Sequence, residues 1–151
     1  MPSDATTPID YTGQFRHGVD AKKRLTIPSD WRSGEEEVVY VRLHSTGSHV
    51  TVLPPAQLRK MVAAIEARKD KTVAEQQKLI RAVSSGAQRC CVDKQGRMVL
   101  PPEFCAKAGL QGEVMLVGSF GQFEIWNTER WIAEQSAVEA ESQDLANELG
   151  L

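Results

Sequence analysis

One nine-residue phrase occurs twice in this chain and constrains its fold more than any other feature. Residues 20–28 read DAKKRLTIP and residues 93–101 read DKQGRMVLP, so the second copy follows the first by 73 residues. The Asp, the Arg and the final Pro are identical, and the apolar residues between Arg and Pro are similar in size. Internal repeats determine architecture, and this one predicts two similar units in one chain.

Each copy of the phrase predicts a tight turn followed by a short strand. An Asp followed by polar or small residues is typical of turns, and Gly96 supplies a permissive backbone in the second copy. Apolar and polar residues alternate after the Arg, as in a half-buried strand, and Pro28 and Pro101 end the run because proline cannot donate to a ladder. A solvated tip with a surface ion pair would explain one such phrase. Its repetition with both charges at matched positions favours a functional role.

The charge of the chain is distributed unevenly, although the net charge is only −2. Residues 14–32 carry a net charge of +3, whereas residues 129–151 carry a net charge of −5. Local potential, more than net charge, attracts a polyanion to a protein surface. The first tip holds three cations and the second holds two, so we expect the first to dominate the electrostatics. With one arginine on the preceding strand, the candidate cations are Arg16, Lys22, Lys23, Arg24, Lys94 and Arg97.

Several classes of function are disfavoured by the sequence. The three cysteines and three histidines lack the spacing of a zinc site. No apolar run approaches the length of a transmembrane helix, and the N-terminus lacks a signal-peptide core, so we expect a protein of the reduced cytosol. We find no nucleophile–base pair, phosphate loop or metal constellation, so the sequence predicts no enzyme, no cofactor, no metal and no small-molecule substrate.

Hydrophobic periodicity predicts a mostly-β α+β fold in five segments. Residues 1–12 are polar and are expected to form a disordered arm. Residues 14–56 and residues 87–130 each predict short strands around a small helix. Residues 57–86 predict an amphipathic helical hairpin whose outer cations we interpret as a solvated surface, and residues 131–151 predict a helix with an acidic tail. Units of about forty residues bury little core alone, so we expect the two units to interleave.

The doubled phrase, together with the run VMLVGSFGQFEIW at residues 114–126, resembles the MraZ family of bacterial transcriptional regulators. The resemblance extends from Gly13 to about Trp131. It implies two AbrB-like swapped-hairpin units that form a small double-hairpin barrel within the chain. It also implies a nucleoid-associated repressor that binds promoter direct repeats of a cell-division and cell-wall gene cluster, and homo-oligomeric rings whose tips face the DNA. The family usually has Gly immediately before the first Arg, where this chain has Lys23, and we expect this lysine to stiffen the turn.

The repeated Asp and Arg are the residues that the family motif carries over: Asp20, Arg24, Asp93 and Arg97. The planar guanidinium of Arg can contact a guanine edge or a phosphate with two hydrogen bonds, and a two-stranded ribbon fits the major groove. A carboxylate repels phosphate, so each Asp is expected either to orient its Arg or to accept backbone N–H groups of the turn. An antitoxin or protein-binding adaptor of the same fold is the alternative function that the sequence leaves open.

Overall fold

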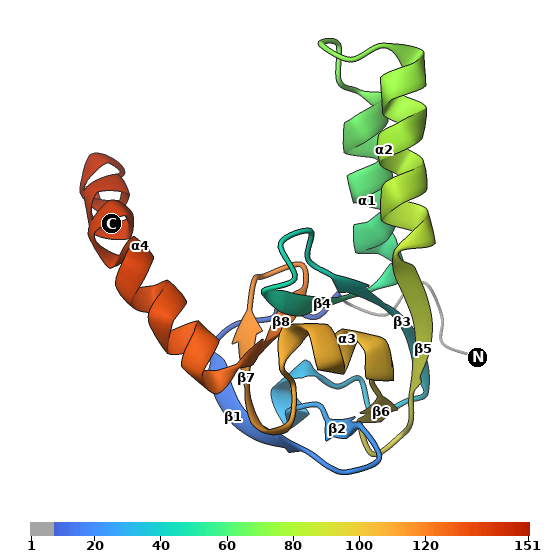
Figure 1. The fold of residues 1–151 in the computed structure, drawn as a ribbon, viewed down its shortest axis with the longest axis vertical. Helices are drawn as coiled ribbons and strands as arrows, with labels where there is room; N and C mark the ends of the chain where they lie inside the picture. Colours follow the sequence, from blue (N-terminus) through green and yellow to red (C-terminus); the bar gives the residue numbers. More distant parts are fainter. Residues whose placement is uncertain (1–7) are drawn as a thin grey trace.

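Strands from both repeats build one antiparallel sheet, as the computed structural model of residues 8–151 shows (Figure 1). The strands are β1 (Gln14–Val19), β2 (Arg24–Thr26), β3 (Glu37–Leu43), β4 (His49–Leu53), β5 (Ala87–Val92), β6 (Arg97–Val99), β7 (Gly112–Gly118) and β8 (Phe123–Asn127). The helices are the 3-10 turn η1 (Ser29–Trp31), α1 (Pro55–Glu66), α2 (Val73–Ser85), α3 (Pro102–Ala108) and α4 (Thr128–Glu148). The mostly-β α+β class expected from the sequence is confirmed.

The two repeats exchange strands throughout the sheet. Its strand order is β1-β7-β8-β4-β3-β5, so β1 of the first repeat pairs with β7 of the second, and β5 of the second pairs with β3 of the first. The hairpins β3–β4 and β7–β8 stay within their repeats, and β4 pairs with β8 across them. Neither repeat could form this sheet alone, which agrees with the expected interleaving.

A separate two-stranded ribbon, β2 with β6, packs beside the six-stranded sheet. Within residues 8–151, β1 and β5 are the edges of the large sheet, so the strands do not close into the barrel expected from the sequence. The physical reason is the length of the ribbon strands: each has three residues before Pro28 or Pro101 ends the ladder. The short ribbon pairs only with itself and leaves the larger sheet open.

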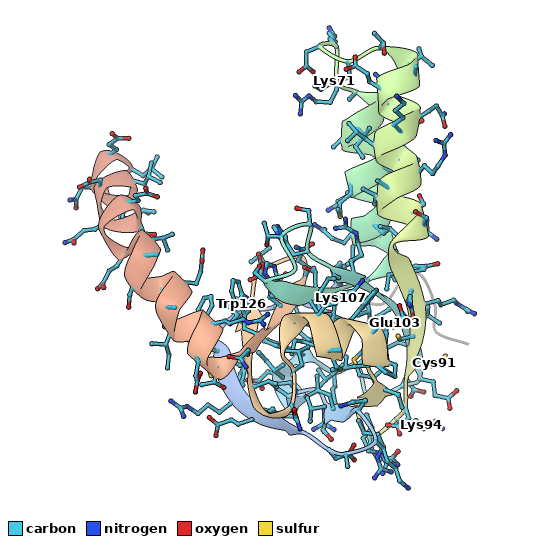
Figure 2. All side chains as sticks on the ribbon, in the orientation of Figure 1. Lys71, Cys91, Lys94, Glu103, Lys107 and Trp126 are labelled. Atoms are coloured by element: carbon cyan, nitrogen blue, oxygen red, sulfur yellow. The ribbon has the colours of Figure 1, made fainter. Side chains whose placement is uncertain are left out.

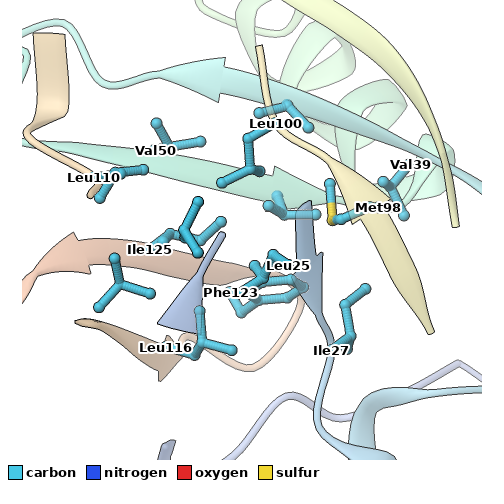
Figure 3. Packing of buried hydrophobic residues seen from close by; sticks show 14 of the residues in the cluster. Leu25, Ile27, Val39, Val50, Met98, Leu100, Leu110, Leu116, Phe123 and Ile125 are labelled. Atoms are coloured by element: carbon cyan, nitrogen blue, oxygen red, sulfur yellow. The ribbon is translucent and has the colours of Figure 1, made fainter. Parts of the chain in front are cut away.

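The core lies between the ribbon and the large sheet. The central residue of each ribbon strand, Leu25 or Met98, is at most 2% exposed and belongs to the same buried cluster as Leu116, Phe123 and Ile125 of the sheet (Figure 3). The tryptophan of η1, which is 1% exposed, packs its ring against the ring of Phe123 at 5.0 Å between centroids. The inner face of the ribbon is therefore fixed by the core, and its outer face is left to solvent.

Two helical arms extend from this body (Figure 1). The α1–α2 hairpin connects β4 to β5, and α2 begins with a capping box in which Thr72 and Glu75 each bond the backbone of the other. Helix α1 ends at Glu66, and α4 continues to Glu148 through the acidic tail. Within residues 8–151, no helix combines the length and apolar composition needed to cross a bilayer.

The N-terminal segment is described from residue 8 onward, so most of the expected disordered arm lies outside the described residues. Tyr11 belongs to that expected arm, yet its side chain is only 5% exposed. Its backbone exchanges two hydrogen bonds with Phe120, at 2.8 and 2.9 Å. The ordered structure thus begins before β1.

Candidate nucleic-acid interface

The first repeated turn is organised by the carboxylate of Asp20. One oxygen, Oδ1, accepts hydrogen bonds from the backbone N–H groups of Lys22 and Arg24, at 2.9 and 2.8 Å. The other oxygen, Oδ2, accepts a bond from Nε of Arg24 at 2.7 Å. The backbone N–H of Lys23 closes the turn onto the carbonyl of Asp20 at 3.0 Å.

The second turn repeats this geometry atom for atom. Oδ1 of Asp93 accepts from the backbone N–H groups of Gln95 and Arg97, both at 2.9 Å, and Oδ2 accepts from Nε of Arg97 at 3.0 Å. The N–H of Gly96 bonds the carbonyl of Asp93 at 2.9 Å. Two turns with different intervening residues have therefore reached the same arrangement through their shared Asp and Arg.

Each Asp performs both roles that the sequence left open, because one oxygen holds the turn and the other holds the arginine. The backbone N–H of Arg24 is the largest of the influences that lower the pKa of Asp20, followed by its side chain, and Arg97 acts in the same order on the pKa of Asp93. Both carboxylates are ionised at neutral pH, so each arginine is held by a charge-assisted bond. That bond uses Nε and directs the two terminal amino groups of the guanidinium outward.

Both arginines lie on the outer face of the β2–β6 ribbon. Arg24 is the ladder partner of Val99, and Arg97 is the ladder partner of Thr26, so all four side chains share the face opposite Leu25 and Met98. The arginine side chains are 52% and 56% exposed. Diagonal neighbours in an antiparallel pair are roughly 7–8 Å apart. The ribbon therefore presents two oriented guanidinium groups at short, fixed spacing.

Exposed lysines extend this charged face at both turns. Lys22 and Lys94 are exposed on the turns themselves. Figure 2 shows Lys94 at the end of the molecule opposite Lys71, which lies at the far end of the α1–α2 hairpin. The cations of the turns and those of the hairpin therefore belong to different surfaces.

Lys23 takes the backbone conformation of the glycine that it replaces. Its φ is 64°, and the matching Gly96 has φ of 80°. This left-handed region costs an L-residue with a β-carbon roughly 1–2 kcal/mol relative to the right-handed region. Lys23 is therefore a strained residue in a turn of unchanged geometry, and the stiffening of the turn stays a prediction.

Arg32 belongs to the first repeat in sequence, but the structure places its side chain at the second turn. Its Nη1 donates to the carbonyl of Gln95, and its side chain occupies the space over Gly96. A β-carbon at Gly96 would clash with the side chain of Arg32, so this arginine would have to move if glycine were replaced. With Arg32 included, each turn has three cations. The expected electrostatic dominance of the first turn is not supported by this count, and only three-dimensional structure brings Arg32 to the other repeat.

Arg16 is the one candidate cation that the structure places away from the turns. Its Nη1 pairs with Oε1 of Glu113 at 3.1 Å, and it lines a groove with Trp131 and Ile132 at the base of α4. An acid beside Arg16 reduces its attraction for phosphate. The six candidate cations thus separate into five at the ribbon and one beside α4.

The ribbon also borders a hollow of about 590 Å³ between its outer face and the start of β3. Arg24 and Arg97 line this hollow together with Glu36 and Glu37. The two acids disfavour an anionic ligand inside it, and burial raises the pKa of Glu37. Among the described residues, no cluster of three or more His, Cys, Asp or Glu side chains is placed to hold a metal ion. The arrangement is suited to contact with a large exposed partner rather than to chemistry in a cavity.

Comparison with known proteins gives one consistent answer. A family model described as "MraZ protein, putative antitoxin-like" matches residues 83–149. A protein of Lachnoclostridium phytofermentans named transcriptional regulator MraZ is 34% identical to this chain, with 93% of this chain and 98% of the relative covered. A protein of the same name from Natranaerobius thermophilus is 30% identical, with coverages of 92% and 96%.

The fold and the candidate site define the class of protein. It is a two-repeat α+β protein with interleaved strands, and it presents paired arginines on the β2–β6 ribbon. The relatives that share almost its whole length then identify the family. This chain belongs to the MraZ family.

Proposed function

We propose that this protein is a sequence-specific DNA-binding transcriptional regulator, and that the β2–β6 ribbon is its DNA-binding element. The observation that carries the proposal is the matched pair of arginines, Arg24 and Arg97, each held by its own aspartate on one exposed face. The two relatives described above are both named transcriptional regulator MraZ, and these names support the proposal. The absence of catalytic chemistry from the sequence motifs agrees with a binding role.

The proposed contact places the ribbon in the major groove. A two-stranded ribbon has the right width for this groove, and the outward amino groups of an arginine can bond O6 and N7 of a guanine. Lys22, Lys23, Lys94 and Arg32 then serve the flanking phosphates, which fix position without reading sequence. Asp20 and Asp93 keep the guanidinium groups ordered before DNA arrives, so less conformational freedom is lost on binding.

The biological assignment is a repressor that acts in the cytoplasm at the nucleoid, on direct repeats in the promoter upstream of its own cell-division and cell-wall gene cluster. We further propose AbrB-like units at residues 14–56 and 87–130, and a homo-oligomeric ring. The exchange of strands supports the assignment of two AbrB-like units. In each pair of strands that joins the repeats, one strand comes from the first repeat and the other from the second. The ring would place several ribbons on successive DNA repeats.

The test is binding to the DNA upstream of the protein's own gene, measured by fluorescence anisotropy against a random duplex of equal length. Wild type should prefer the promoter, and Arg24→Ala with Arg97→Ala should lose that preference while keeping its circular dichroism spectrum and its mass by light scattering. Arg16→Ala is the matched control, since that arginine lies away from the ribbon and its loss should change affinity little. Equal binding of both duplexes by wild type would contradict the proposal.

A second candidate function is supported by the term antitoxin-like in the family description. In that case the main task is to bind one protein partner, and DNA binding is secondary. Recovery of one partner in equimolar amount with the purified protein would favour this role. The ribbon mutant distinguishes the two functions, because it should release DNA and retain a protein partner that binds elsewhere.

A further inference from the structure

The two helical arms carry opposite charge and leave opposite ends of the sheet. The α1–α2 hairpin and its flanks, residues 55–86, contain seven cations and three acids, a net charge of +4. Helix α4 contains one cation and six acids, a net charge of −5. The hairpin leads into β5, one edge strand, whereas Trp131 at the base of α4 donates a hydrogen bond to Gln14 of β1, the other edge strand.

Each arm exposes large apolar side chains. In the described part of the chain, neither α1 nor α2 has a buried residue, although each is amphipathic, and Val73 and Leu79 are 75% and 42% exposed. On α4, Ile132 and Leu145 are 53% and 59% exposed. A helix of this kind gains most of its stability from packing of its apolar face. The arms therefore have the composition of surfaces that are covered in the assembled protein.

The apolar and acidic residues of α4 form two parallel rows. Residues spaced seven apart return to nearly the same side of a helix, and residues three apart are neighbours. The apolar row is Trp131, Val138 and Leu145, and each of its members is followed three residues later by an acid of the second row: Glu134, Glu141 and Glu148. On α2, the exposed cations Lys78 and Arg81 are also three apart, so they share one side of the helix. The acidic row of α4 can therefore pair with opposite charge when it meets this side of α2.

We infer that the acidic face of α4 in one copy of the chain docks against the basic α1–α2 hairpin of the next copy. In Figure 1 the arms diverge from opposite flanks of the body, so an arm and a hairpin of one chain lie on different sides of it. A second α4 would repel the first by charge, and DNA would repel α4 as well. The surface of opposite charge that this protein offers is the hairpin of another copy.

This inference rests on the proposed oligomer and specifies its interface. Joining two different surfaces at opposite ends of a molecule is a heterologous contact, which closes into a ring or continues as a filament. Both arms leave the body on the side away from β2 and β6 (Figure 1). Successive copies in a ring would therefore present their ribbons on the same face, which suits direct repeats in DNA.

The experiment is a charge exchange read by light scattering. Variant one carries Glu134→Lys and Glu141→Lys on α4, and variant two carries Lys78→Glu and Arg81→Glu on α2. All four side chains are exposed, so both variants should keep the wild-type circular dichroism spectrum. Wild type should have a mass several times that of the 16.7 kDa chain, and each variant alone should fall toward 16.7 kDa.

Mixing the two variants should restore the large assembly, because the lysine pair on each changed α4 then meets the glutamate pair of a changed hairpin, and each unchanged α4 meets an unchanged hairpin. The control with the same change of charge is Glu35→Lys with Glu103→Lys, two exposed acids of the body, which should assemble like wild type. Assembly of either variant alone, or failure of two folded variants to assemble when mixed, would overturn the interface. A wild-type mass of one chain would overturn the oligomer itself, and binding of DNA by the ribbon is measured independently of both.

Discussion

Lys23 offers a perturbation whose effect can be worked out from the backbone. Its φ of 64° costs a residue with a β-carbon roughly 1–2 kcal/mol. Glycine adopts this conformation freely but loses about 0.5–1 kcal/mol more conformational freedom on folding. The change Lys23→Gly should therefore stabilise the fold by about 0.5–1 kcal/mol, which in a chain of this size raises Tm by roughly 1–4 °C.

The assay is thermal unfolding of wild type, Lys23→Gly and Lys23→Ala at one protein concentration, since assembly makes Tm depend on concentration. Lys23→Ala removes the charge and keeps the β-carbon, so the difference between the two variants isolates the backbone. Gly96→Ala is the mirror experiment and should destabilise the protein, because alanine is strained at a φ of 80° and its β-carbon would displace the side chain of Arg32. A Lys23→Gly protein that melts at or below the Tm of Lys23→Ala would refute the strain argument.

The same pair of variants measures the contact of Lys23 with DNA. Each phosphate contact contributes about 0.9 to the slope of log affinity against log salt. If Lys23 touches a phosphate, both variants should flatten that slope by about one unit per engaged subunit and weaken all sequences similarly. An unchanged slope in both would mean that the lysine points away from DNA.

Further outcomes concern the core and the carboxylates. Trp31→Ala should lower the free energy of unfolding in urea by about 3–5 kcal/mol, because the ring is 1% exposed, whereas Phe120→Ala, at a side chain 65% exposed, should cost little. Asp20 and Asp93 have lowered pKa values in the folded state, so their stabilisation of the turns is present above the ordinary pKa of 3.8 and is lost as pH falls through the lower folded values. A carboxyl titration followed by NMR should give midpoints below 3.8 for both, and midpoints at or above 3.8 would show that the turn bonds are not formed in solution.

The sequence predicted the elements well because their signals are local. The doubled phrase located both turns, and the Asp and Arg of each phrase meet within five residues, so their pairing follows from turn geometry. The prolines at residues 28 and 101 marked the ends of β2 and β6 correctly.

The missing information is non-local. Alternation identifies a strand and its buried face but not its partner, so the pairing of β2 with β6 required the structure. That pairing is what brings Arg24 and Arg97 to one surface, and the packing of η1 beside the second turn is what brings Arg32 to Gln95. The same holds for the two charged arms. Their charges could be predicted from the sequence, but only the fold shows that they lie at opposite ends of the sheet.

The central claim is that Arg24 and Arg97 contact guanine edges, and replacing single guanines of the operator by 7-deazaguanine tests it most directly. This base lacks the N7 acceptor and keeps its pairing. Wild type should lose about 1–3 kcal/mol of binding free energy at the contacted guanines, which is roughly a 5- to 150-fold loss of affinity. Arg24→Ala and Arg97→Ala should each become insensitive at the guanine that its arginine contacts. Uniform wild-type affinity for every substituted operator would contradict the claim and leave the ribbon with phosphate contacts alone.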